Sequence, residues 1–282
     1  MSLANFVPTV WSAKILQEMD KAHILVPLCN REYEGEIRGF GDTVKINAVG
    51  DITVNNYAPN VTEITPEQLT APQSVLEIDQ AKYFAFYIDD VDDAQTKPKV
   101  MGEAMRKAAY ALSDTADQLI AGFHSQASVT IAATGLTTDG GNMLQALSNT
   151  ARALDENNVP SQGRWMVVPP WFHQYMIRAE ILQTDGSITA DASYRNSYIG
   201  KSFGFDVYMS NNLSTGVATA HPRAHYVMAG VQRAMSFAEQ IVKVEAYRPE
   251  NSFSDAVKGL HVYGAKVIQP NALVRINASA TE

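Results

Sequence analysis

Two glycine-rich motifs in the chain resemble phosphate-binding loops, but each lacks a residue that the chemistry needs. Gly200-Lys201-Ser202 is similar to the end of a P-loop, yet Arg195 stands where that loop requires its first glycine. Gly39-Phe40-Gly41 lacks the third glycine of a dinucleotide fingerprint and falls in a predicted strand. We therefore expect a simple turn at residues 200–202 and no nucleotide cofactor.

Two groups of side chains could hold a metal ion. The densest charge cluster lacks the ligand spacing, the central glycine and the distal glutamate of a calcium loop. It precedes a predicted long helix, whose N-terminal dipole favours negative charge. His221 and His225 are four residues apart, but Pro222 between them argues against a helical metal pair. A structural role is preferred for both groups, and no metal and no catalytic residue is predicted. The acidic cluster consists of Asp89, Asp90, Asp92 and Asp93.

The composition narrows the class of protein. The chain has 282 residues and a formal net charge of −8, which argues against a protein whose main task is gripping nucleic acid or an anionic membrane. Its single cysteine, Cys29, excludes a disulfide framework. No segment is apolar enough to span a membrane, and the N-terminus does not resemble a secretory signal. Charged residues make up 18% of the chain, against roughly 25% on average, so we expect other chains to cover part of its surface.

A long hairpin is predicted in the first third of the chain. Residues 35–49 and 75–88 read as strands, with Val44 and Ile46 alternating with polar neighbours. The connection from Gly50 to Ser74 is about 25 residues long and has little periodicity, so its tip should pack on a neighbouring copy. Candidate contact residues at this tip are Asn55, Asn56, Tyr57, Glu63 and Glu67.

The longest predicted helix follows at residues 97–127, where apolar residues recur at steps of three and four. Its basic residues are interpreted as a solvated or subunit-contacting face of the helix and not as a surface that binds nucleic-acid phosphates. They are Lys97, Lys99, Arg106 and Lys107.

Shorter elements are predicted in the second half of the chain. Helices are expected at 142–158, with Leu144 on the buried face, and from Pro170 to Leu182. Strands are expected at 165–168, 205–209 and 224–229, and over most of 235–277. Breaks in the last region are expected at Pro249, Gly259 and Pro270.

The order of these elements and six local motifs resemble the major capsid proteins of tailed bacteriophages, the HK97-fold family. The likeness extends from about Phe6 to Ala278 and looks closest to coat proteins that assemble with separate scaffolding. The motifs lie at residues 6–12, 41–46, 81–86 with 89–95, 164–170, 204–213 and 263–270.

The resemblance implies an α+β fold with named parts. Residues 1–30 would be the N-arm and 31–88 the extended E-loop. Residues 89–138 would be the peripheral (P) domain with its spine helix, joined by returning strands in 233–282. Residues 139–232 would be the compact axial (A) domain.

The function implied is a structural one. Copies of the chain would form pentamers and hexamers of an icosahedral shell that encloses double-stranded DNA without binding it tightly. A separate scaffolding protein, a portal protein and possibly a cement protein would be partners, and assembly would take place in the cytoplasm of the host bacterium. Two alternatives stay open: an encapsulin-type bacterial compartment, and an α+β enzyme.

Overall fold

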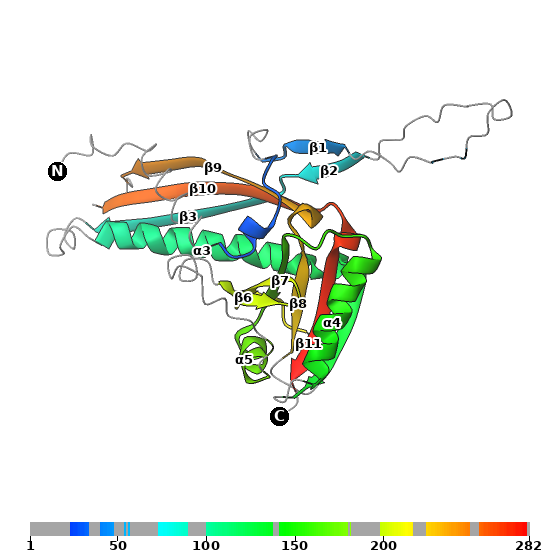
Figure 1. Cartoon of the computed structure of the whole chain (residues 1–282). Helices are drawn as coiled ribbons and strands as arrows, with labels where there is room; N and C mark the ends of the chain where they lie inside the picture. Colours follow the sequence, from blue (N-terminus) through cyan, green and yellow to red (C-terminus); the bar gives the residue numbers. More distant parts are fainter. Residues whose placement is uncertain are drawn as a thin grey trace.

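The computed structural model describes residues 23–33, 40–47, 54, 56, 73–89, 100–137, 141–179, 181, 198–216, 224–248 and 254–280. They form sheets of two, three and six strands, with a long helix beside the three-stranded sheet (Figure 1). This mixture of helix and sheet confirms the predicted α+β class.

The three-stranded sheet and the long helix form one body. Strands β3 (Gln80–Asp89), β10 (Ser254–Val267) and β9 (Met235–Tyr247) are antiparallel, with β10 in the centre. Helix α3 (Val100–Gly122) runs along this sheet and continues as the 3-10 turn η4 (Phe123–Gln126) (Figure 1). Met105, Ala109 and Leu112, at helical spacing, pack against Val244 and Val257. The predicted helix at 97–127 is confirmed, with slightly narrower bounds.

The six-stranded sheet forms the second body, in the order β4-β11-β8-β5-β7-β6. Its strands are β4 (Val129–Leu136), β5 (Arg164–Val168), β6 (Tyr198–Ser202), β7 (Phe205–Met209), β8 (Ala224–Val231) and β11 (Leu273–Ala280). Helix α4 (Gly141–Glu156) packs on β4 and β11. Helix α5 (Pro170–Arg178) begins with a proline, whose missing N–H is tolerated in the first turn. Residues of both helices join the largest apolar core.

A two-stranded hairpin, β1 (Thr43–Asn47) and β2 (Gln73–Glu77), lies at the end of the three-stranded sheet (Figure 1). Val44 and Ile46 are buried, as their alternation predicted. Together with Leu76 and Ile78, they pack against Ala238 of β9 and Val262 of β10. The hairpin base is therefore part of the subunit's apolar core.

The single strand predicted at 75–88 is wrong, because the chain changes partner after Glu77. Strand β2 pairs with β1, whereas β3 pairs with β10. Between them the Ile78 side chain is fully buried, its backbone N–H donates to Asp42 O at 3.0 Å, and its carbonyl accepts from Gly41 N at 3.0 Å. Gln80 and Lys82 interrupt the apolar face between Ile78 and Phe84, and this interruption marks the bend in the sequence.

Two other expectations about the strands are wrong. Gly259 does not break β10, because it lies within the strand and leaves room for the ring of Phe84 on β3. Residues 200–202 are not a turn, since they form the end of β6. The turn lies at Phe203 and Gly204, both with positive φ (50° and 80°), which suits a tight hairpin connection.

The helices of the second body also differ from expectation. Leu144 is 50% exposed, while Met143, Leu147 and Thr150 face the core. Thr150 can be buried because its hydroxyl donates to the carbonyl of Ala146 in its own helix, at 2.7 Å. Helix α5 ends at Arg178, short of the predicted Leu182. Strand β4 was not predicted.

Candidate functional site

The base of the hairpin is fixed to the three-stranded sheet by polar and steric contacts. The Lys266 ammonium on β10 donates to the carbonyl of Val75 on β2 at 2.7 Å. Gly264 of β10 lies so close to β2 that a Cβ there would meet the carbonyl oxygen of Glu77. The direction in which the hairpin leaves the body is therefore set by contacts at its base.

The predicted contact residues at the hairpin tip fall almost entirely outside the described residues. Asn55, Tyr57, Glu63 and Glu67 are among those not described. Asn56 is exposed, as is its described neighbour Val54, with 92% of its surface accessible. Their role as subunit contacts stays a prediction.

The face of the three-stranded sheet turned away from α3 carries exposed aromatic residues. On β3, Tyr83 and Tyr87 are 79% and 70% exposed, because the alternate residues Phe84 and Phe86 pack towards the helix. Tyr247 on β9 lies level with Tyr87 across the small Ala256 of β10. Exposed apolar surface of this kind is typical of protein interaction sites.

One charged pair on this outer sheet face joins β9 and β10. The Lys258 ammonium lies 3.1 Å from a carboxylate oxygen of Glu245 and 5.1 Å from the ring centre of Tyr247. We call this surface the outer sheet face. It consists of Tyr83, Tyr87, Tyr247, Lys258, Glu245 and Leu260.

The basic residues of α3 do not form a cluster in the described part of the chain. Arg106 and Lys107 are exposed, and Arg106 pairs with Glu103 at 3.8 Å. Lys97 and Lys99 lie outside the described residues. Whether this face contacts another subunit stays a prediction.

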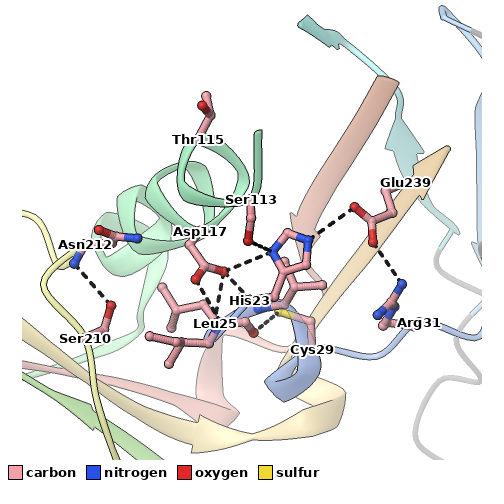
Figure 2. A network of polar contacts seen from close by, with 12 residues as sticks. His23, Leu25, Cys29, Arg31, Ser113, Thr115, Asp117, Ser210, Asn212 and Glu239 are labelled. Carbon is pink, nitrogen blue, oxygen red and sulfur yellow. Dashed lines mark hydrogen bonds and ion pairs between the residues drawn. The ribbon is translucent and has the colours of Figure 1, made fainter. Parts of the chain in front are cut away.

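A buried polar junction joins the N-terminal segment to α3, and the sequence analysis did not find it (Figure 2). The carboxylate of Asp117 accepts hydrogen bonds from the backbone N–H groups of Ile24, Leu25 and Val26, at 2.9, 3.1 and 3.3 Å. These donors lead into the short 3-10 helix η2 (Val26–Leu28), where no residue of the segment itself caps them. Asp117 on α3 therefore caps η2, accepting the N–H hydrogen bonds that an N-cap side chain of the same segment would usually accept.

His23 lies at the centre of the junction, between carboxylates from two elements (Figure 2). Its Nδ1 is 3.0 Å from Ser113 Oγ and 3.7 Å from Asp117 Oδ1, and its Nε2 is 3.6 Å from Glu239 Oε2 on β9. Burial alone would lower the pKa of His23, but the nearby carboxylates of Asp117 and Glu239 outweigh it and raise the pKa to about 9. The imidazole is therefore charged at neutral pH.

Glu239 extends the junction to β10 and to the end of the N-terminal segment. Its Oε2 is 3.0 Å from His261 Nε2, and its Oε1 accepts from the Arg31 guanidinium at 2.9 Å. Burial alone would raise the pKa of Glu239, but His23 and His261 lower it to about 2. The junction therefore ties the segment to α3, β9 and β10 at once.

Of the residues considered as metal ligands, His225 has a described side-chain contact. His225 accepts a hydrogen bond from Trp171 Nε1 at 3.0 Å. His221, Asp90, Asp92 and Asp93 lie outside the described residues. Within the described ranges, no group of three or more His, Cys, Asp or Glu side chains could hold a metal ion, and no helix is long and apolar enough to cross a membrane.

Comparisons with known proteins match most of the chain. Residues 73–276 match a family model described as phage capsid protein. A solved structure from Mycobacterium phage Che8 is 28% identical with a TM-score of 0.71, and the match covers 92% of each chain. A search of curated proteins finds no match.

More distant structures share the fold. The capsid of Cyanophage P-SCSP1u is 18% identical with a TM-score of 0.65, covering 87% of this chain and 85% of that one. A virus-like particle from Pyrococcus furiosus is 12% identical with a TM-score of 0.57, covering 96% and 99%.

Proposed function

The chain belongs to the phage capsid protein family, and from this premise we propose how its parts act in a shell. It is a structural protein with the HK97-like fold, the major capsid protein of a tailed phage, and its copies form the icosahedral shell of the virion. The encapsulin alternative is not favoured, because the matching family model is that of phage capsid proteins. We propose in addition that the subunit has no enzymatic activity.

We propose the division into parts that the resemblance implies, with boundaries moved at three places. Residues 1–30 act as the N-arm, 89–126 with 235–267 as the P domain, and 139–232 as the A domain. The pairing of β4 (Val129–Leu136) and β11 (Leu273–Ala280) within the six-stranded sheet supports adding these two strands to the A domain. The pairing of β3 with β10 supports assigning 80–89 to the P domain and limiting the E-loop to about 31–79.

The E-loop hairpin is proposed to dock on an adjacent subunit. The observation that carries this is that β1 and β2 pair with each other and, among the described strands, with no third one. A two-stranded ribbon is marginal in water, so the part beyond the core-packed base needs an external partner. The exposed aromatic residues of the outer sheet face offer a neighbouring copy the kind of surface that such a ribbon needs.

Deleting residues 54–68 tests this proposal. The base contacts of β1 and β2 remain in the variant, so we expect a folded, soluble subunit that forms no shells. As a matched control, a Gly-Ser segment of the same length in place of residues 54–68 keeps the loop length and should also fail to assemble. Normal shells from either variant would refute the docking role.

The remaining partners are proposed from family resemblance. Pentamers and hexamers of the chain, a separate scaffolding protein, a portal protein and a cement protein would build the shell in the cytoplasm of the host bacterium. The net charge of −8 supports a DNA-facing surface that encloses the genome without gripping it, because tight binding would impede packaging and ejection.

A further inference from the structure

Strand β4 is one edge of the six-stranded sheet, and its open side has no partner in the described part of the chain. Its single neighbour is β11, to which it is parallel, and the ladder is regular over residues 129–133. In a strand with one neighbour, every second residue directs its backbone N–H and C=O to the open side. We propose that an extended segment of an adjacent copy of the chain adds to this edge as a further strand. This inference rests on the proposed shell function.

The other edge strands that the structure describes in the two larger sheets carry features that hinder pairing. At the opposite edge of the same sheet, β6 contains the exposed Lys201, and its register with β7 shifts between Tyr198 and Gly200. In the three-stranded sheet, the edge strands β3 and β9 contain Lys82 and Glu245. Charges and bulges on an edge strand disfavour the addition of another chain. The eight residues of β4 include no charged residue and no proline, so this edge lacks such protection.

A hollow beside β4 leaves its open side accessible. The hollow has a volume of about 400 Å³ and is lined by residues 129–132 of β4 and by residues of α4. Successive side chains of a strand point to opposite faces of the sheet. Consecutive residues therefore line one hollow together where the backbone edge itself borders it. The outward N–H and C=O groups face the space that an added strand would occupy.

The lining of the hollow favours an uncharged segment. Its two charged residues pair with each other, with Arg152 Nε 3.6 Å from Glu156 Oε1. The other lining residues of α4 and its C-terminal end are uncharged: Asn149, Ala153 and Asn157. Only 18% of the chain is charged, so uncharged segments are frequent in it, and in a shell its own copies are present at a high local concentration. The occupant that fits these conditions is therefore a second copy.

The place of β4 in the fold agrees with a contact between neighbours of one ring. The strand lies in the six-stranded sheet, which we assign above to the A domain. Each subunit would receive a segment from one neighbour at β4 and give the corresponding segment to the other. Such a head-to-tail contact uses two different surfaces of the subunit, and its repetition closes a ring. Pentamers and hexamers are rings of this kind.

Amide hydrogen exchange, followed by mass spectrometry of peptides that cover β4, tests the proposal in the wild-type chain. About two amides among residues 129–133 point to the open side. They should exchange freely in the folded free subunit and on the order of 100-fold more slowly in the shell, where they gain an acceptor. Unchanged exchange in closed shells would overturn the proposal and leave the shell function standing. Slower exchange only while scaffolding protein is bound would assign the edge to that protein and overturn its assignment to a second copy.

A matched pair of variants at one exposed position tests the edge by assembly. Ala132 is exposed, so a larger side chain there should leave the subunit folded, with a Tm close to that of the wild type. A132K places a charge on the edge and should lower the yield of shells at least about 10-fold. A132T keeps the edge uncharged and favours a strand, so its yield should equal that of the wild type. Equal yields from A132K and A132T would contradict the proposal. Should A132K not fold, the exchange measurement on the wild type decides.

Discussion

Replacing Gly264 by alanine should destabilise the subunit, because the new methyl group meets backbone and not a side chain that could move away. A Cβ at this position would lie against the carbonyl oxygen of Glu77 and 3.0 Å from Ile78 Cα, at the bend between β2 and β3. Overpacking in a filled core costs about 1–3 kcal/mol, and an unyielding backbone neighbour puts the change at the upper end. Alanine recovers only about 0.5–1 kcal/mol over glycine in a strand, so the steric cost prevails.

The measurement is thermal unfolding of the purified subunit. With an entropy of unfolding of about 2.1 cal/mol/K per residue, a net loss of about 2 kcal/mol corresponds to a fall in Tm of roughly 3–4 °C for a chain of 282 residues. The matched control is Gly102→Ala in the first turn of α3, where a Cβ would have no neighbour within 4 Å. That change should raise stability by up to about 1 kcal/mol, as alanine favours helix. An unchanged or higher Tm for Gly264→Ala would refute the steric reasoning.

The remaining predictions concern the junction, the charge and the shell. Asp117→Ala should lower the free energy of unfolding, measured by urea titration, by about 3–5 kcal/mol, because it removes the acceptor of three backbone N–H groups and leaves His23 facing one carboxylate. The control is Asp114→Ala, which removes only an exposed hydrogen bond with Gln118 and should change the free energy of unfolding by less than about 0.5 kcal/mol. The pKa of Glu239 is lowered from 4.5 to about 2 in the folded protein, so its contribution to the free energy of unfolding is present above pH 4.5 and is lost as the pH falls towards 2. The stability of E239Q should therefore fall less steeply than that of the wild type as the pH is lowered. Free subunits should show no duplex DNA binding at physiological salt, and micromolar affinity with a steep salt dependence in a fluorescence assay would contradict this. The chain has no lysine between Gly50 and Ser74, so mature shells boiled in detergent should run as a single band near the monomer mass, whereas a ladder resistant to reductant would reveal covalent links.

Elements in which apolar residues recur regularly over a long stretch could be predicted from the sequence. Helix α3 repeats its apolar residues over 23 residues, so it was found close to its observed bounds. The alternation from Thr43 located β1, but the strand predicted at 35–49 starts too early, since residues 40–42 are not part of it. Strand β4 was missed because its apolar face, formed by Val129, Ile131 and Ala133, is short and is interrupted at Gly135. The bend at Ile78, where the strand partner changes, was missed although Gln80 and Lys82 interrupt the apolar face there.

The buried junction could not be predicted because its partners are far apart in the chain. His23 and Ser113 are 90 residues apart, and Arg31 and Glu239 are 208 apart. One signal was present: Ser113 and Asp117 interrupt the apolar stripe of α3, and polar residues on a buried helix face need partners. Which partners they have depends on the tertiary fold.

Electron microscopy of the purified protein, expressed alone and together with its phage's scaffolding protein, tests the central claim most directly. A shell protein whose hairpin docks on its neighbours should give closed particles built from five-fold and six-fold clusters of subunits. Subunits that stay monomeric under both conditions, while remaining folded by circular dichroism, would contradict the account.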